Sequence, residues 1–324
     1  MIVRWGLAEL EPLLAELGIE RPLLIASPRW ADLELPIAER FHGVKSHAER
    51  AAVSEAAERA EAADGLVALG GGSAVDSAKA IGAKLGLPVV AVPTTYAGAE
   101  WTSFFGMRDP ERGVKEGGSG PSPVAIVYEP RLTLDLSREA SGGTALNALA
   151  HCAEALYVEG RNAEADSHAL EGARLIGETL PAVLEAPHDL EARTTLLEGA
   201  MHAGAALGSA GLGLGHAMAQ ALGGRYGIAH GAANAICLPP ALRFNQPVAS
   251  AEIGRFGEAL DATDPVARTE ELARLSGFGR LREPGVPEAE LDEVAEATVV
   301  RRGAQANPRP ATPAEVAELL RSVW

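Results

Sequence analysis

Residues 65–82 read GLVALGGGSAVDSAKAIG, and this stretch decides the fold. The apolar run 65–70 predicts a buried strand that ends in glycines, and residues 73–86 have an alanine-rich helical pattern. Glycines between a strand and a helix let backbone N–H groups approach an anion, because they carry no Cβ. Ser73 is a good N-cap, and a helix N-terminus adds a partial positive charge. The stretch therefore predicts a phosphate-binding turn; a capped helix after a glycine turn without a ligand is the alternative.

Short apolar runs and helical patterns alternate on both sides of this turn. Strands are expected at 22–27, 87–92 and 124–128, and helices at 7–18 and 46–64. Alternating strands and helices are typical of a parallel sheet with crossover helices. Residues 1–137 are therefore expected to form an α/β, Rossmann-like nucleotide-binding domain. The other glycine-rich run, GLGLG at 211–215, follows a helical segment and is expected to be a loop that enters a helix.

After Ser137 the pattern changes to long stretches rich in alanine, leucine and glycine. These predict an all-helical domain over residues 138–324 that holds the substrate or metal. Ligand pockets are common between domains, so we expect the site in the cleft between the two.

Composition and charge exclude several classes of protein. The chain has 324 residues, a formal net charge of −16, 47% hydrophobic and 22% charged residues, and two cysteines. An acidic chain does not fit nucleic acid or anionic lipid as a partner. No apolar run is long enough to span a membrane, and the few cysteines fit a reducing compartment. The expectation is a cytoplasmic protein with a small-molecule ligand.

Four side chains of the kind that bind metals occur in two short segments. Asn147 and His151 lie four residues apart on a predicted helix and so share a face. His216 opens another helix, and His230 follows after a glycine-containing turn. A single helical histidine is more often solvated or packed in a core than a ligand. Neutral imidazoles suit zinc or iron, whereas Asn147 brings no charge and weakens a divalent site. The pattern predicts a site that works with or without metal.

The stretches GGGSAVDSAKAIG (70–82), PTTYAGAEWT (93–102) and the spaced histidines resemble the iron-containing alcohol dehydrogenase superfamily. HGVKSHAERAAVSEA (42–56), AIVYEPRLTLDLS (125–137), ALNALAHCAEALYV (145–158) and the tail 306–324 look most like its maleylacetate reductase branch. The resemblance covers essentially the whole chain.

This resemblance implies a dehydroquinate synthase-like architecture, a homodimer, and NAD(H) or NADP(H) as cofactor. The dinucleotide would be bound by Gly71, Gly72, Ser73, Asp76, Thr94, Thr95, Thr102 and Lys115. A divalent zinc or iron ion, where one is used, would be held by Asn147, His151, His216 and His230. The resemblance also implies that metal-using relatives carry Asp where Asn147 stands, and that the reductase branch carries Asn.

Three features depart from the family pattern. Gln220 stands where relatives carry a histidine, and residues 230–245 look more like the general alcohol dehydrogenases. The N-terminus is short, which leaves the mode of dimerisation open. The strand at 22–27 ends without the acidic residue that usually holds a ribose, so the choice between NADH and NADPH stays open.

The resemblance implies reduction of the conjugated double bond of maleylacetate to give 3-oxoadipate in aromatic-compound catabolism. Hydride would add to the alkene carbon β to the ketone, and His151, His216 and His230 would stabilise the enolate. Tyr96 could contact the substrate or only pack, and Arg225 and Arg243 could bind this dicarboxylate or pair with acids at the surface. A metal-dependent alcohol dehydrogenase for small aldehydes or ketones and a catalytically inactive nucleotide-binding homologue are the alternatives.

Overall fold

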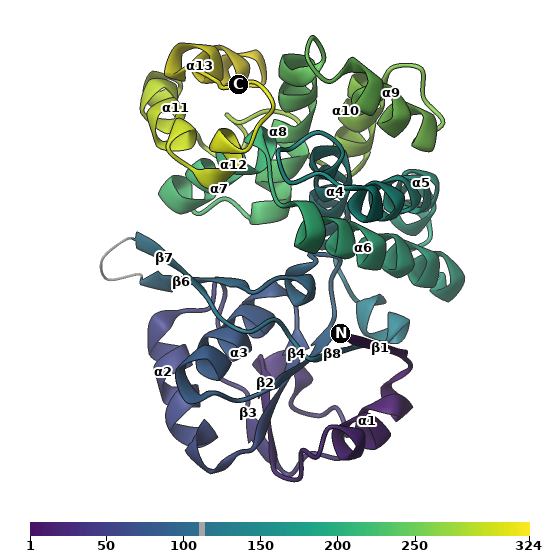
Figure 1. Ribbon diagram of the computed structural model, residues 1–324, viewed down its shortest axis with the longest axis vertical. Coiled ribbons are helices and arrows are strands. Elements are labelled where there is room, and N and C mark those ends of the chain that lie inside the picture. Colours follow the sequence, from purple (N-terminus) through teal and green to yellow (C-terminus); the bar gives the residue numbers. More distant parts are fainter. Residues whose placement is uncertain (110–113) are drawn as a thin grey trace. The chain divides into compact units, whose positions relative to one another are not determined.

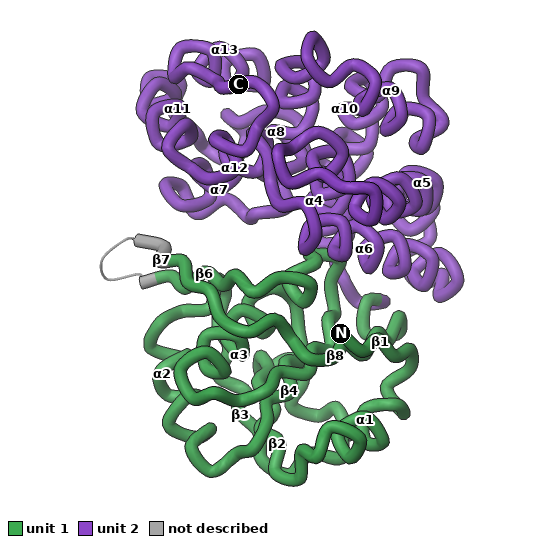
Figure 2. The backbone as a smooth tube through the Cα atoms, in the orientation of Figure 1, with its two compact units in different colours: residues 1–133 green, residues 134–324 purple. Residues whose placement is uncertain are grey.

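The computed structural model describes residues 1–109 and 114–324, without the side chains of residues 109–116. The chain divides into two compact units, residues 1–133 and residues 134–324 (Figure 2). The first is an α/β unit, and the second is built from helices (Figure 1).

Unit 1 is organised by a six-stranded sheet with the order β1-β8-β5-β4-β2-β3. All pairings in it are parallel. The strands are β1 (Ile2–Trp5), β2 (Pro22–Ala26), β3 (Glu39–Phe41), β4 (Gly65–Gly70), β5 (Val89–Pro93) and β8 (Ala125–Tyr128). An antiparallel hairpin, β6 (Phe104–Asp109) and β7 (Val114–Ser119), lies outside this sheet. The parallel α/β fold expected from the alternating pattern is confirmed.

Helices cover both faces of the sheet, which is why its strands are almost continuously apolar. Alternate residues of β4 belong to two different cores: Leu66 and Ala68 to one, Val67 and Leu69 to the other. The first core includes residues of α2 (Arg50–Arg59) and α3 (Gly72–Leu85). The second includes the leucines of α1 (Leu10–Glu16). Figure 1 shows α2 and α3 on one side of the strands and α1 on the other.

The helix expected at 46–64 is shorter than predicted. It begins at Arg50, and a 3₁₀ turn over Ala60–Ala62 completes it. Residues 46–49 instead form a turn in which His47 and Ala48 have positive φ angles of 60° and 48°. A backbone bond holds this turn, because the N–H of Arg108 donates to the carbonyl of His47 at 3.1 Å. A contact from a distant segment therefore overrides the local helical preference.

Unit 2 contains helices and no strand among its described residues. They are α4 (Arg138–Ala155), α5 (Ala163–Glu185), α6 (Leu190–Ala210), α7 (Leu214–Tyr226), α8 (His230–Asn245), α9 (Ser250–Ala259), α10 (Pro265–Leu275), α11 (Leu291–Val299), α12 (Arg302–Gln305) and α13 (Pro313–Ser322). Ser137, Asn162 and Asp189 cap the starts of α4, α5 and α6 by accepting hydrogen bonds from backbone N–H groups. Residues 211–213 of the GLGLG run connect α6 to α7, and Leu214 and Gly215 begin α7, so the run is a loop that enters a helix, as the sequence predicted.

Glycines allow the helices of unit 2 to pack closely. A Cβ on Gly172 of α5 would lie 2.8 Å from the sulfur of Cys152 in α4 and 3.0 Å from the carbonyl oxygen of Gly199 in α6. A Cβ on Gly199 would lie 2.9 Å from the side chain of Ile176. Neither substitution fits without a shift of the neighbouring helix. In the described part of the chain, none of the helices combines the length and apolar character that crossing a bilayer requires.

Candidate active site

The glycine turn at the end of β4 is shaped by close backbone approaches. Gly70 has φ 150°, and a Cβ there would lie 2.8 Å from Cβ of Ala74. A Cβ on Gly71 would lie 2.9 Å from Cγ2 of Thr95. The N–H of Thr94 donates to the carbonyl of Gly70 at 3.0 Å, which ties the turn to the segment after β5. Any side chain at these two glycines would push the turn away from its neighbours.

The start of α3 presents backbone donors beside this turn. The N–H groups of Ala74 and Val75 donate to the carbonyl of Gly71 at 3.0 and 3.3 Å. The N–H groups of Gly72 and Ser73 come too early in the helix to find an intrahelical acceptor. A helix start with such N–H groups can bind a phosphate. The hydroxyl oxygen of Ser73 accepts from the N–H of His47 at 2.9 Å.

Asp76 and Lys79, which share a face of α3, connect this helix to the hairpin. The carboxylate of Asp76 pairs with Nζ of Lys79 at 3.0 Å and accepts from the N–H of Gly106 at 3.1 Å. The buried Nζ of Lys79 also donates to the carbonyls of Ala99 and Phe104 and to the hydroxyl of Thr102. These contacts fix the segment that leads from β5 to β6. The side chain of Lys115 lies outside the described residues.

The segment after β5 contains a buried polar group that the sequence analysis did not single out. Burial raises the pKa of the Glu100 carboxyl. Its oxygen accepts from the hydroxyl of Tyr128 at 3.0 Å, and that hydroxyl accepts from the indole N–H of Trp101 at 2.8 Å. Tyr96 is fully buried, and Thr94 is 4% exposed. These contacts hold the residues that follow the PTT sequence in one conformation.

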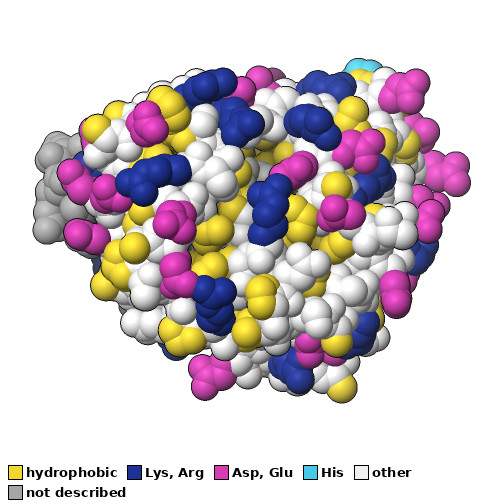
Figure 3. All heavy atoms as spheres, turned by 90° about the horizontal axis from the view of Figure 1, so that it is seen from above, with side chains coloured by type: hydrophobic (Ala, Val, Ile, Leu, Met, Phe, Trp, Pro, Cys, Tyr) yellow, Lys and Arg dark blue, Asp and Glu magenta, His cyan; other side chains and the backbone are white. Residues whose placement is uncertain are grey.

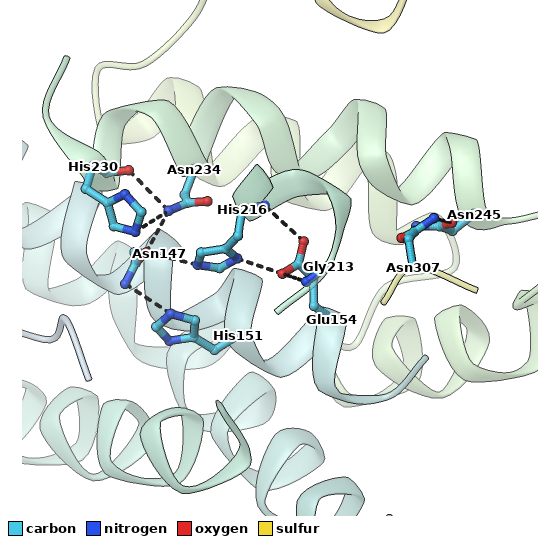
Figure 4. A network of polar contacts seen from close by, with 9 residues as sticks. All are labelled: Asn147, His151, Glu154, Gly213, His216, His230, Asn234, Asn245 and Asn307. Carbon is cyan, nitrogen blue, oxygen red and sulfur yellow. Dashed lines mark hydrogen bonds and ion pairs between the residues drawn. The ribbon is translucent and has the colours of Figure 1, made fainter. Parts of the chain in front are cut away.

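The four predicted metal-type side chains come together in unit 2 (Figure 4). The rings of His151 and His216 stack with centroids 4.7 Å apart, and those of His216 and His230 lie 5.7 Å apart. Asn147 lies between them, with Oδ1 at 3.3 Å from Nε2 of His216 and Nδ2 at 3.5 Å from Nε2 of His151. His151 and His216 are buried, whereas His230 is exposed. The cluster is therefore open to solvent at His230.

Glu154, which the sequence analysis did not single out, fixes the position of His216. Its carboxylate is fully buried and accepts from the N–H of Gly213 at 2.6 Å and from the N–H of His216 at 3.1 Å. Nδ1 of His216 lies 2.7 Å from the same carboxylate. An ionised carboxylate only accepts, so Nδ1 carries a hydrogen and Nε2 faces the cluster. The sequence contained one signal for this residue: Glu154 is an acid in an otherwise apolar part of the helix that carries Asn147 and His151.

Asn234 is the second residue missed from the sequence. It lies four residues after His230 on α8, the same spacing as Asn147 and His151 on α4. Its Nδ2 donates to Oδ1 of Asn147 at 2.7 Å and lies 3.1 Å from Nε2 of His230. The four-residue spacing between an Asn and a His, which occurs on both helices, could have indicated Asn234 from the sequence. Asn234 thereby connects the histidine at the start of α8 to the buried part of the cluster.

Two buried polar atoms of the cluster lack a hydrogen-bond partner among the described residues, Nδ1 of His151 and Oδ1 of Asn234. Such atoms are costly unless a water or ligand satisfies them. Burial lowers the pKa of His151 well below its ordinary value, and the charges of His216 and His230 lower it further. His151 is therefore held as a neutral imidazole that can exchange hydrogen bonds with a ligand.

No carboxylate of the described residues is bonded where the three imidazoles meet. The carboxylate of Glu154 faces Nδ1 of His216, on the far side of that ring from Asn147. The carbonyl oxygen of Asn147 already accepts from Asn234. Across residues 1–109 and 114–324, no three His, Cys, Asp or Glu side chains are arranged to hold a metal ion.

The two arginines predicted to bind substrate lie at the surface of unit 2. Arg225 pairs with Glu290 at 2.7 Å and also with Glu293, and Arg243 pairs with Glu270. Figure 3 shows acidic and basic side chains interspersed on the face that it views, as expected where ion pairs are common. Cys152, which follows His151 in the sequence, is buried, and burial raises the pKa of its thiol, which agrees with an unreactive thiol.

Comparison with known proteins places this geometry in a family. Residues 3–130 match the model for iron-containing alcohol dehydrogenases, and residues 142–324 match the C-terminal model of the Fe-containing alcohol dehydrogenase family. Maleylacetate reductase 2 of Cupriavidus pinatubonensis is 35% identical over 322 residues, which cover 95% of this chain and 89% of that protein.

Solved structures agree with these matches. The structure of maleylacetate reductase from Agrobacterium tumefaciens superposes with a TM-score of 0.91 at 32% identity, covering 100% of this chain and 95% of that one. An iron-containing alcohol dehydrogenase from Corynebacterium glutamicum gives a TM-score of 0.91 at 30% identity, with 100% and 94% covered. The chain belongs to the iron-containing alcohol dehydrogenase family and is an NAD(P)-dependent oxidoreductase.

Proposed function

We propose that this enzyme reduces the conjugated double bond of maleylacetate to give 3-oxoadipate, with NADH or NADPH as the reductant. The observation that carries the proposal is the cluster of three imidazoles and one amide. The amide is that of Asn147, and it occupies the position at which a metal-dependent enzyme needs a charged ligand. Curated relatives named maleylacetate reductase align over nearly the whole chain, which supports the same substrate.

The dinucleotide would bind at the start of α3. Its pyrophosphate would lie on the N–H groups of Gly72 and Ser73, with Gly71 allowing close approach. Asp76, Lys79 and Thr102 would act by fixing the loop around the dinucleotide, because their polar atoms bond to one another and to that loop. Thr94, Thr95 and Lys115 complete the proposed cofactor residues, and Tyr96 is a proposed catalytic residue.

The chemical step is a hydride transfer to an activated alkene. A bound reduced nicotinamide would supply a hydride to the carbon β to the ketone and would thereby be oxidised. The alkene electrons would then move to the ketone oxygen to give an enolate, and a proton from solvent would add to the α carbon. Imidazole N–H groups near the enolate oxygen lower the barrier by stabilising its charge. His230, at the exposed end of the cluster, and the neutral His151 are the side chains proposed for this contact.

The family implies a divalent ion, and the residues present do not fit one in the arrangement that they adopt. No described carboxylate points at the meeting point of the rings, and the amide oxygen of Asn147 accepts from Asn234. A neutral set of three imidazoles and one amide binds divalent ions less strongly than a set with a carboxylate. The proposed reaction therefore has no step on a metal ion.

A metal-dependent reductase of small aldehydes or ketones is the second candidate, because the three histidines are the ones that would bind the ion. A panel of substrates separates the two. We expect purified full-length protein to oxidise NADH or NADPH with maleylacetate at a kcat/KM at least about a hundredfold above that with simple aldehydes. Preference for aldehydes would overturn the proposal, and absence of any oxidation would favour an inactive homologue.

A further inference from the structure

A pocket in unit 1 is lined by basic side chains. Its volume is about 290 Å³, and its lining consists of Lys45, Ser46, His47, Glu49 and Arg108. Lys45 to Glu49 come from the turn that precedes α2, and Arg108 comes from β6. The sequence pattern predicts a helix over residues 46–64, which would include most of this turn.

The pocket is directly connected to the glycine turn. The N–H of His47 donates to the hydroxyl oxygen of Ser73, the second residue of α3, at 2.9 Å. Arg108 bonds through its N–H to the carbonyl of His47 and forms an isolated β-bridge with Glu49. A group bound at the start of α3 therefore lies next to the wall of this pocket.

The charges of the pocket favour an anion. Its one carboxylate, Glu49, pairs with Nζ of Lys45 at 3.2 Å, so this acid and this base offset one another. Among the described residues, no carboxylate pairs with the guanidinium of Arg108. An arginine placed in this way can bind a phosphate with two parallel hydrogen bonds.

We propose that this pocket binds the 2′-phosphate of the adenosine ribose of NADPH, so that the enzyme prefers NADPH to NADH. This inference depends on the proposed binding of the dinucleotide at α3. NADPH differs from NADH by that single phosphate. Enzymes that use NAD usually place an acid on the ribose hydroxyls, and the strand β2 is followed here by Ser27 and Pro28. A basic pocket beside the pyrophosphate site is what the additional 2′-phosphate requires.

The test uses two dinucleotides that differ only in this phosphate, NADP+ and NAD+, and needs no turnover of any substrate. Calorimetry on the full-length protein should show that NADP+ binds at least about tenfold more tightly than NAD+. In R108Q the affinity for NADP+ should fall by about ten- to a hundredfold, while the affinity for NAD+ changes less than about threefold. The variant K45Q should act in the same direction with a smaller effect.

R21Q is the matched control, because Arg21 is exposed and precedes the amino end of β2, whereas Gly70 is at the carboxyl end of β4. It should leave both affinities unchanged. Circular dichroism melts of all variants check that the fold is intact. Equal affinity for the two nucleotides in the wild type, or equal losses in R108Q, would overturn the inference and leave the proposed function standing. Failure of both nucleotides to bind would overturn the nucleotide site as well.

Discussion

Replacement of Glu154 by glutamine tests the buried support of the histidine cluster. Three N–H donors converge on this carboxylate: those of Gly213 and His216 in the backbone, and Nδ1 of the His216 ring. Glutamine has nearly the same shape, but one of its two polar ends is a donor. Whichever way the amide turns, at least one buried N–H then faces another donor.

The size of the effect follows from these contacts. One unsatisfied buried donor costs about 1–3 kcal/mol, and loss of the charge weakens the remaining hydrogen bonds. We expect E154Q to lower the free energy of unfolding of unit 2 by about 2–4 kcal/mol. The orientation of His216 is lost at the same time, so kcat should fall by at least about tenfold.

Urea unfolding followed by circular dichroism measures the first effect, and steady-state oxidation of the reduced cofactor measures the second. Glu178→Gln is the control, because Glu178 is an exposed residue of α5 that pairs with Arg174 at the surface. It should change stability by less than about 0.5 kcal/mol. If E154Q were as stable and as active as E178Q, the role assigned to this carboxylate would be wrong.

Three further substitutions test other contacts. Asn234→Ala removes the amide that connects Asn147 to His230, so stability should fall by about 1–3 kcal/mol and kcat should fall with it, as calorimetry and steady-state kinetics will show. Gly71→Ala places a Cβ 2.9 Å from Cγ2 of Thr95 and should raise the KM for the cofactor by about tenfold in steady-state kinetics; an unchanged KM would contradict the close approach. Burial, and then the charge of His168, lower the pKa of His202 below 6.5. The unfolded chain therefore binds more protons below that pH, so the free energy of unfolding should fall as the pH decreases from 7 to 5. Urea unfolding of H202N should show a weaker dependence.

The sheet of unit 1 was predictable because its signals are local. The run from Gly65 to Gly70 has the length and apolar character of a buried parallel strand, and the alanine-rich helix after it begins within one residue of the predicted start. The strand β3 is only three residues long, Glu39–Phe41, and gives no such pattern. The positive φ angles at His47 and Ala48 depend on contacts with Ser73 and Arg108, which no local pattern contains.

The histidine cluster was predictable for a different reason. Its members are uncommon residue types in two short segments, with Asn147 and His151 at helical spacing, and the resemblance to a family implied that the four side chains meet. Glu154 and Asn234 are ordinary residues whose importance comes only from partners far away in the sequence. The ion pairs of Arg225 and Arg243 have the same origin, since their acidic partners lie on other helices.

The most direct test of the account is the rate of maleylacetate reduction by metal-depleted protein. The full-length enzyme is dialysed against a chelator, its metal content is measured by mass spectrometry, and oxidation of NADPH and NADH is followed with maleylacetate. We predict a rate within about twofold of the untreated enzyme at less than about a tenth of an equivalent of metal. Loss of activity that zinc or iron restores would contradict the metal-free imidazole and amide site.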